Sequence, residues 1–564
     1  MNNRKRILTL LINGVLLSSL CVASAADTTT GSGNGIAYGT GSTANNTLDV
    51  ALGNKANVEN YVGQNGSIAI GANSHVENMA GGAEAAVGMG QTSYSGNFWS
   101  SARVPADPSK VVGSVAIGNN TYARTGSTMI GSHNYRGAIG DITIDTDNNG
   151  TRGANLNVYA TTVGANSFSN GAFTTTTGTY NVISSTYTGG RFSTPTQNFG
   201  ATVNGAFNSI ESTSGGSTAG VATAITGVAN RVANSNGVLV YGAGNEITNS
   251  STSFSTPGES ATSAKDFSDK LKTAVTSSNG AGATMAFGGG NKADYTLRTS
   301  MIGVNNTVTG VRGNQSKDNL AIGVGNTGTK VQHMTVIGSK NTVSDANNTL
   351  VLGDNRTVTS ANNTVILGSS DNGTTTTVND AVAVGHNTEV SAVGGAAIGS
   401  NSKATVAAGT VGYDVLTNAP STKTSSTWVS TASAMSVGDV DNNVTRQITS
   451  VAAGTNDTDA VNVAQLKLLR NNVGGDITNI QNNITNINGN MARLDKRVNR
   501  GVAGAAALAA LHPLDFDPDA KWDFAAGYGH YHNGNAAALG AFYRPNEDVQ
   551  LSVGSTVGNG ETVV

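Results

Sequence analysis

The chain has 564 residues, of which 12% are charged and 5% are aromatic, and its formal net charge is −3. This near-neutral composition gives no electrostatic basis for binding nucleic acid. The sequence also shows no catalytic-triad signature and no histidine spacing typical of zinc sites. We therefore expect a protein that is not an enzyme and that has no catalytic residues, cofactor or metal.

The N-terminal residues 1–25 have the features of a secretory signal peptide. Arg4, Lys5 and Arg6 precede an apolar stretch over 7–20, and Ala23-Ser24-Ala25 is a typical cleavage site, with the cut after Ala25. The stretch is too short for a membrane anchor. The single cysteine, Cys21, lies inside this segment, so the mature chain is expected to have no disulfides and to be stabilised by burial and oligomerisation.

A short phrase, small-apolar-small-apolar-Gly-x-Asn, recurs through residues 26–139 and 301–405. Two copies are Ser67–Asn73 and Ser114–Asn120, and later copies recur about every fifteen residues, with glycines at Gly303, Gly323, Gly338, Gly353, Gly368, Gly385 and Gly399. Alternation predicts a short strand with one buried face, and the glycine allows a turn with positive φ. A second, weaker apolar stretch in each repeat predicts a parallel β-roll with two strands per turn, stable only when its turns stack.

Residues 140–300 are less regular, and we expect them to be head with insertions that loop out of the roll, including a short helix within 260–277. These insertions are either a variable binding surface or a spacer without a binding role. Asp145–Gly150 matches the first half of a calcium loop. However, Leu156 stands where the bidentate glutamate belongs, so a structural turn is favoured.

A heptad seam is predicted in the stalk region, residues 467–500. Its apolar residues are separated alternately by four and three positions: Val473, Ile477, Ile480, Ile484, Ile487, Met491, Leu494 and Val498. Isoleucine at both core positions of a heptad favours three or four strands over two. We therefore predict that this seam assembles the chains.

The last segment, residues 501–564, alternates apolar with small or polar residues from Trp522 onward, as membrane strands do. It has room for only three strands and the start of a fourth. Open sheet edges are not tolerated in lipid, so several chains must pool their strands. The alternative, a cytosolic coiled coil with a small β domain, is disfavoured by the signal peptide.

The stretch Arg446–Leu466 resembles the neck of trimeric autotransporter adhesins, the YadA-like family of type V secretion. The neck residues that carry the likeness are Asp457, Asp459, Ala460, Val461, Asn462, Gln465 and Leu466. Trp428, within 406–445, resembles the family's tryptophan-bearing connector, the repeated phrase resembles its head, and Leu494–Val564 resembles its anchor. Signal, head, connector, neck (446–466), stalk and anchor follow one another in the family's order.

This resemblance implies a mainly β fold with a coiled coil. The expected parts are a trimeric left-handed parallel β-roll head, a neck, a short trimeric stalk and a twelve-stranded trimeric outer-membrane β-barrel with four strands per chain. Gly540 matches a glycine that faces the barrel lumen in the family, although an ordinary strand glycine is the alternative. One departure is that the chain stops at Thr562-Val563-Val564, where most of the fourth strand is missing. Either the sequence is a fragment or this chain would assemble poorly.

The resemblance also implies a function. We expect a homotrimer at the outer membrane and cell surface of a Gram-negative-type bacterium, in contact with outer-membrane lipids and the outer-membrane assembly machinery. It would export its own head and attach to host matrix, host cells or other bacteria. Self-association in autoagglutination or biofilms is an alternative. A β-helix enzyme acting on carbohydrate is disfavoured because the repeats lack recurring acidic residues.

Overall fold

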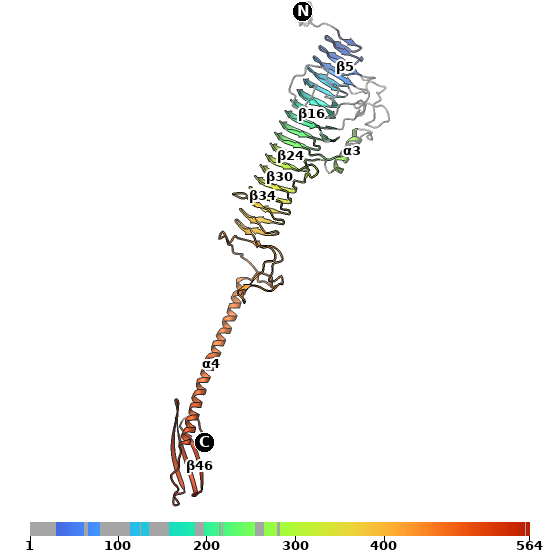
Figure 1. The fold of residues 1–564 in the computed structure, drawn as a ribbon. Coiled ribbons are helices and arrows are strands. Elements are labelled where there is room, and N and C mark those ends of the chain that lie inside the picture. The colour runs from blue at the N-terminus through green and yellow to red at the C-terminus, as the bar shows by residue number, and fades with distance from the viewer. Residues whose placement is uncertain are drawn as a thin grey trace, which may run out of the picture. The chain divides into compact units, whose positions relative to one another are not determined.

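A computed structural model of the protein describes residues 30–60, 66–78, 113–124, 126–134, 157–185, 197–213, 216, 218–253, 264–278, 282–558 and 560–564 (Figure 1). The chain divides into two compact units, Met1–Arg446 and Gln447–Val564, which are treated separately. The predicted cleavage site at Ala25 and the turn at Asp145–Gly150 lie outside the described residues.

The first unit is a parallel β-roll with two main files of strands. The first file pairs in parallel, each strand with the strand one turn away. Its strands are β2 (Ile36–Tyr38), β4 (Val50–Leu52), β6 (Ile68–Ile70), β8 (Val115–Ile117), β10 (Thr128–Ser132), β12 (Thr161–Ala165), β15 (Thr175–Thr179), β17 (Thr202–Ala206), β19 (Ala224–Val228), β21 (Leu239–Ala243), β23 (Met285–Gly289), β26 (Ser300–Val304), β29 (Leu320–Val324), β31 (Gln332–Ser339), β33 (Asn347–Leu352), β35 (Val365–Leu367), β37 (Val382–Val384), β39 (Ala396–Ile398) and β43 (Met435–Ser436).

The second file alternates with the first along the chain and forms several sheets. Its longest sheet contains β13 (Phe168–Ser169), β16 (Val182–Ser185), β18 (Ser209–Ser212), β20 (Arg231–Ala233), β22 (Glu246–Thr248), β24 (Lys292–Asp294), β27 (Thr307–Thr309), β30 (Thr327–Thr329), β32 (Thr342–Ser344), β34 (Arg356–Thr359) and β36 (Thr374–Thr376). A second sheet contains β1 (Ser32–Gly33), β3 (Thr43–Ala44), β5 (Asn57–Asn60), β7 (His75–Asn78) and β9 (Tyr122–Arg124). The remaining strands are β11 (Asn157–Val158) with β14 (Gly171–Ala172), β25 (Thr296–Leu297) with β28 (Ser316–Lys317), β38 (Glu389–Val390) with β40 (Lys403–Ala404), and the hairpin β41 (Tyr413–Asp414) with β42 (Ala419–Pro420).

The repeated phrase explains the roll. In β8 the central Ala116 points inward and is fully buried, while its neighbours Val115 and Ile117 face outward and are half-buried. The glycine that follows turns the chain with positive φ, as at Gly323 (φ +122°). A Cβ on Gly323 would lie 1.8 Å from the carbonyl oxygen of Gly338 in the next turn, so both the backbone geometry and the stacking require glycine.

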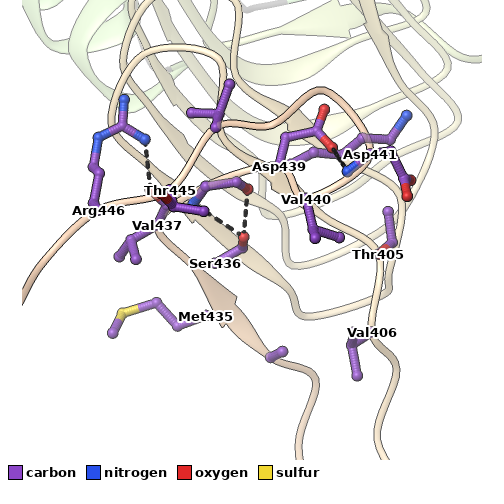
Figure 2. Close-up of a pocket in the computed structure, with 14 residues that line it drawn as sticks. Thr405, Val406, Met435, Ser436, Val437, Asp439, Val440, Asp441, Thr445 and Arg446 are labelled. Atoms are coloured by element: carbon purple, nitrogen blue, oxygen red, sulfur yellow. Dashed lines mark hydrogen bonds between the residues drawn. The ribbon is translucent and has the colours of Figure 1, made fainter.

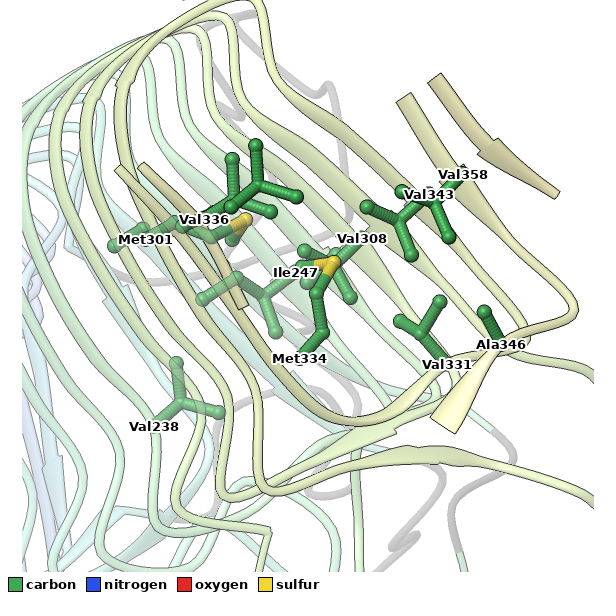
Figure 3. Packing of buried hydrophobic residues seen from close by; sticks show 14 of the residues in the cluster. Val238, Ile247, Met301, Val308, Val331, Met334, Val336, Val343, Ala346 and Val358 are labelled. Carbon is green, nitrogen blue, oxygen red and sulfur yellow. The ribbon is translucent and has the colours of Figure 1, made fainter. Parts of the chain in front are cut away.

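The core between the two files is narrow and filled by small aliphatic side chains (Figure 3). Met301 and Val336 from the first file meet Val308 and Val343 from the second, and all are at most 1% exposed. At Gly328 the missing side chain leaves room for a methionine, since a Cβ there would lie 2.9 Å from Cε of Met334. From Ile183 to Ala404 the core is therefore one continuous column that no single turn could bury.

An asparagine ladder runs inside the roll alongside this column. The side-chain oxygen of Asn306 accepts both the backbone amide (3.2 Å) and the side-chain amide (2.9 Å) of Asn326. The same pair of bonds joins successive asparagines at Asn181, Asn208, Asn230, Asn245, Asn291, Asn306, Asn326 and Asn341. The ladder continues through residues 181–291, so the less regular part of the chain keeps the roll. The segment between β22 and β23 contains the helix α3 (Ala264–Ser277), at the position where the sequence predicts one.

The second unit contains the helix α4 (Val463–Ala509) and an antiparallel sheet of β44 (Trp522–Tyr531), β45 (Gly534–Asn546) and β46 (Val549–Val557). The parallel roll, the long helix and the C-terminal β sheet confirm the predicted fold class. Among the described residues, neither helix is long and apolar enough to cross a bilayer.

Candidate functional site

The seam residues form an exposed apolar stripe along α4. Their exposed fractions run from 48% for Val473 to 63% for Met491, and the four isoleucines lie between 52% and 57%. Apolar side chains this exposed, at heptad spacing, are typical of a helix whose partners are other copies of itself. We predict that these residues pair between chains.

The neck residues begin α4 with a capping box. The side-chain oxygen of Asn462 accepts the amide of Gln465 at 3.1 Å, and Oε1 of Gln465 accepts the amide of Asn462 at 3.2 Å. Gln465 also bonds to the amide and the carbonyl of Gly454, each at 3.3 Å. These two side chains therefore satisfy orphan amides of the first helical turn and hold the preceding loop against it.

Asp459 organises the loop before the helix. Its Oδ2 accepts the backbone amides of Thr455 and Asn456, both at 2.9 Å. These bonds, with that from Asn456 the strongest, hold the pKa of the Asp459 carboxyl below its ordinary value. The other predicted neck residues make no such contacts in the described chain and are exposed: Asp457, Ala460, Val461 and Leu466.

The end of α4 packs against one face of the anchor sheet through residues with little or no side chain. Ala503 and Ala507 are fully buried there, beside Ala538. A Cβ on Gly529 would lie 2.2 Å from the carbonyl oxygen of Ala503, and one on Gly527 would lie 2.3 Å from that of Ala507. These glycines let the helix backbone approach the sheet closely. The sequence places them on the small-residue face of the strand but does not mark them as contacts of the helix.

Gly540 lies on the same face as these glycines. A Cβ there would lie 2.8 Å from Cδ1 of Leu511 and 3.2 Å from Cε2 of Phe542. Its neighbours are ends of flexible side chains rather than backbone, so it is less tightly enclosed than Gly529. The position faces the helix, which is the side that the predicted lumen role requires.

The opposite face of the sheet carries large apolar side chains. Trp522, Phe524 and Tyr528 of β44 are 60%, 75% and 67% exposed, and Leu551 and Val553 of β46 are 62% and 63% exposed. A β-sheet with one small-residue face against a helix and one exposed apolar face has the side-chain pattern of a membrane strand set. Within the described residues, β44 and β46 each pair as strands with β45 alone.

A cavity of about 460 Å³ lies at the end of the first unit, between the last turn of the roll and the connector (Figure 2). Arg446 closes one side: its Nη1 donates to Ser402 Oγ at 2.9 Å, and the guanidinium lies against Gly399. The lining combines exposed apolar side chains such as Met435 with charged ones such as Asp439. In the connector, Lys423 Nζ lies 4.2 Å from the ring centre of Trp428, a cation–π contact. In the described part of the chain no three histidine, cysteine or acidic residues group as metal ligands would.

Two family models match this chain in its second unit. Residues 447–489 match the coiled stalk of trimeric autotransporter adhesin, and residues 514–564 match the YadA-like membrane anchor domain. The stalk and anchor are those of a YadA-like trimeric autotransporter adhesin. The YadA-like anchor assigns the chain to the outer membrane and the cell surface, as predicted.

Curated relatives agree with this assignment. The chain is 55% identical over 74 residues to the autotransporter adhesin BadA of Bartonella henselae and 51% identical over 74 residues to the trimeric autotransporter adhesin AtaA of Acinetobacter sp. (strain Tol 5). It is 45% identical over 64 residues to the adhesin YadA of Yersinia pseudotuberculosis serotype I (strain IP32953). The matches cover 13%, 13% and 11% of this chain but only 2%, 2% and 14% of these relatives. The YadA-like family is one of adhesins, which are in general not enzymes.

Proposed function

We propose that the protein is a homotrimeric surface adhesin that exports its own head. In this proposal three α4 helices pair through the seam, and three anchor sheets pool their strands in one outer-membrane barrel, which has twelve strands in the form that the family resemblance implies. The head then attaches the cell to host matrix, host cells or other bacteria. The outer-membrane assembly machinery would insert the anchor.

One observation carries the proposal: a helix with an exposed isoleucine stripe is followed, after residues 510–521, by a sheet with an exposed apolar face whose outer strands pair, within the described residues, on one side only. A sheet edge leaves backbone amides and carbonyls without partners, which is costly in lipid unless other strands complete the ladder. The seam would bring those strands together, since each isoleucine gains about 1.5–3 kcal/mol on burial. One threefold assembly therefore satisfies both surfaces.

The packing of α4 against the sheet supports the export step. Three helices in one lumen need narrow side chains, and the buried alanines and facing glycines of this chain provide them. The passenger would pass through the lumen before the helices occupy it. Gly540, on the helix-facing side, belongs to this narrow surface.

The test is display of the full-length chain in the outer membrane of a Gram-negative host. Outer membranes extracted in detergent without boiling should give a band at three times the single-chain mass, and boiling should give single chains. Displaying cells should bind at least one immobilised matrix protein, for example a collagen, fibronectin or laminin, better than cells without the chain. A single-chain band without boiling would refute the trimer, and correct display without binding to matrix or to other cells would refute the adhesin.

A further inference from the structure

The outward side of the longest second-file sheet carries a regular array of hydroxyl groups. In four successive strands, β27, β30, β32 and β34, both outward positions are threonine or serine. We call this surface the threonine face; it consists of Thr307, Thr309, Thr327, Thr329, Thr342, Ser344, Thr357 and Thr359. Thr375 of β36 continues one of its two rows.

The rows are in strict register. Thr307 pairs with Thr327, which pairs with Thr342, and Thr309, Thr329 and Ser344 do the same in the other row. Neighbouring strands in a sheet are about 4.7–4.9 Å apart, and alternate residues along a strand about 6.6–6.8 Å. Hydroxyls within a row also approach one another, as between Ser344 and Thr359 at 3.2 Å. The face is therefore a regular lattice of methyl and hydroxyl groups.

This lattice rests on the asparagine ladder. Asn306, Asn326 and Asn341 of the ladder each immediately precede a threonine of the face, so the interior amide bonds fix the register of the rows. Threonine is stiff at χ1, so its side chain loses little conformational freedom when another surface packs on it. The face is thus preordered for contact.

The roll itself does not require threonine at these positions. In the three preceding turns one row holds Arg231, Glu246 and Lys292, aligned with Thr307. Arg231 forms ion pairs with Glu211 (2.7 Å) and Glu246 (2.8 Å), so this part of the sheet satisfies its charges internally. From β27 onward the row carries uncharged hydroxyl groups in place of paired charges. We infer that this part of the sheet contacts another molecule.

We propose that the threonine face binds the same face of a second copy of this protein on another cell. A hydroxyl both donates and accepts, so a hydroxyl lattice is complementary to itself, whereas a lattice of like charges would repel its copy. A two-fold axis perpendicular to the fibres relates two such faces in antiparallel orientation, which is how fibres from two facing cells meet. The first file exposes apolar side chains instead, such as Ile302, Val304 and Val324, and these are left for contacts within the trimer. This inference rests on the proposed surface display.

The size of the face sets the strength of a single contact. Five strands at about 4.8 Å and two rows about 7 Å apart span roughly 200 Å². A stable interface needs about 800 Å² per partner, so one pair of faces binds weakly. Three faces per trimer and many fibres per cell would make the contact effective through avidity. Clumping of cells, rather than association of free protein, is the appropriate measurement.

A charge exchange tests the inference on cells that display the full chain. One strain carries Thr327→Lys with Thr342→Lys, and a second carries Thr327→Glu with Thr342→Glu. Each strain alone should clump about tenfold less than the parent, because identical faces now repel. An equal mixture of the two strains should clump again, because opposite charges then meet. The matched control, Gln332→Lys with Asn347→Lys, adds the same charge in neighbouring turns outside the face and should clump like the parent.

Surface trimer level is measured for every strain by the unboiled gel. Loss of display in all strains, the parent included, would refute the proposed function itself. With display intact, three results would overturn the inference: a parent that does not clump, lysine or glutamate strains that clump like the parent, or a mixture that does not recover. If soluble uncharged polysaccharide blocks the parent and the mixture stays dispersed, the face binds a glycan instead.

Discussion

The backbone amide of Arg356 donates to the side-chain oxygen of Asn341 at 2.9 Å, so an arginine occupies the step after the last asparagine of the ladder. Its side chain extends the hydrogen bonding into later turns, with Nε donating to Gly368 O and Nη1 to Thr388 O, both at 2.7 Å. Arg356 is 1% exposed, and burial lowers the pKa of its guanidinium. Within the described residues it forms no ion pair, so backbone carbonyls and the hydroxyl of Thr388, which accepts from Nη2 at 3.1 Å, solvate its charge.

Replacing this arginine should destabilise the C-terminal end of the roll. Arg356→Ala leaves several buried carbonyls unbonded at about 1–3 kcal/mol each, so we expect a loss of about 3 kcal/mol or more. Arg356→Asn should lose less, because an asparagine could repeat the bond that Asn341 makes to Gly353 O in the turn before. Thermal unfolding of the purified trimer, with Thr357→Ala as the outward-facing control, would measure both. Equal stability of the alanine and asparagine variants would contradict this role.

The seam makes a second prediction. Ile480→Asn with Ile484→Asn should strongly reduce surface trimer, because each isoleucine gives up about 1.5–3 kcal/mol of burial in every chain. Asn482→Gln lies at the heptad position farthest from the seam and should leave the trimer unchanged. Surface level and unboiled gel mobility report the result. Parental levels of trimer in the double variant would exclude these residues from the interface.

Much of this fold could be predicted because its signals are local. Alternation in Val115-Ala116-Ile117 marks a strand with one buried face without knowledge of its neighbours. The heptad spacing likewise marks the stalk part of α4 within one segment, but the helix begins four residues before the predicted stalk, 467–500, and continues nine residues beyond it.

What could not be predicted depends on which turn stacks on which. The phrase suggests that its asparagine serves the turn, and Asn305 does have φ +56°. The ladder, however, uses the next residue, Asn306. It also links turns that are separated by an insertion, as between Asn245 and Asn291. The rows of the threonine face and the contact of Gly529 with Ala503 likewise join residues far apart in sequence, so composition alone did not mark them.

A third prediction concerns the anchor glycines. The atoms around each glycine determine how strongly its substitution should impair display. Gly529→Ala should impair display more than Gly540→Ala, because the added methyl meets helix backbone at Gly529 and a flexible leucine end at Gly540. Gly540→Arg should block or slow export, since an arginine cannot fit between the sheet and Leu511. Ala537→Leu, on the exposed face, is the control and should display normally. Display is measured with antibody against the head on intact cells; normal display of Gly540→Arg would show that residue 540 does not face the lumen.

Asp459 makes the neck sensitive to acid. The pKa of its carboxyl is lower in the folded chain than the ordinary aspartate value of about 3.9, because amides of Asn456 and Thr455 donate to the charged form. A lowered folded pKa contributes stability that is complete above the unfolded pKa and is lost as pH falls through the folded pKa. The backbone amides of Thr455 and Asn456 should therefore exchange faster below about pH 4 than the intrinsic pH dependence of amide exchange alone would give. Asp459→Asn should have weaker protection at neutral pH and lack this additional acid step. If Asp459→Asn showed the same additional loss of protection at low pH, the acid sensitivity would belong to another group.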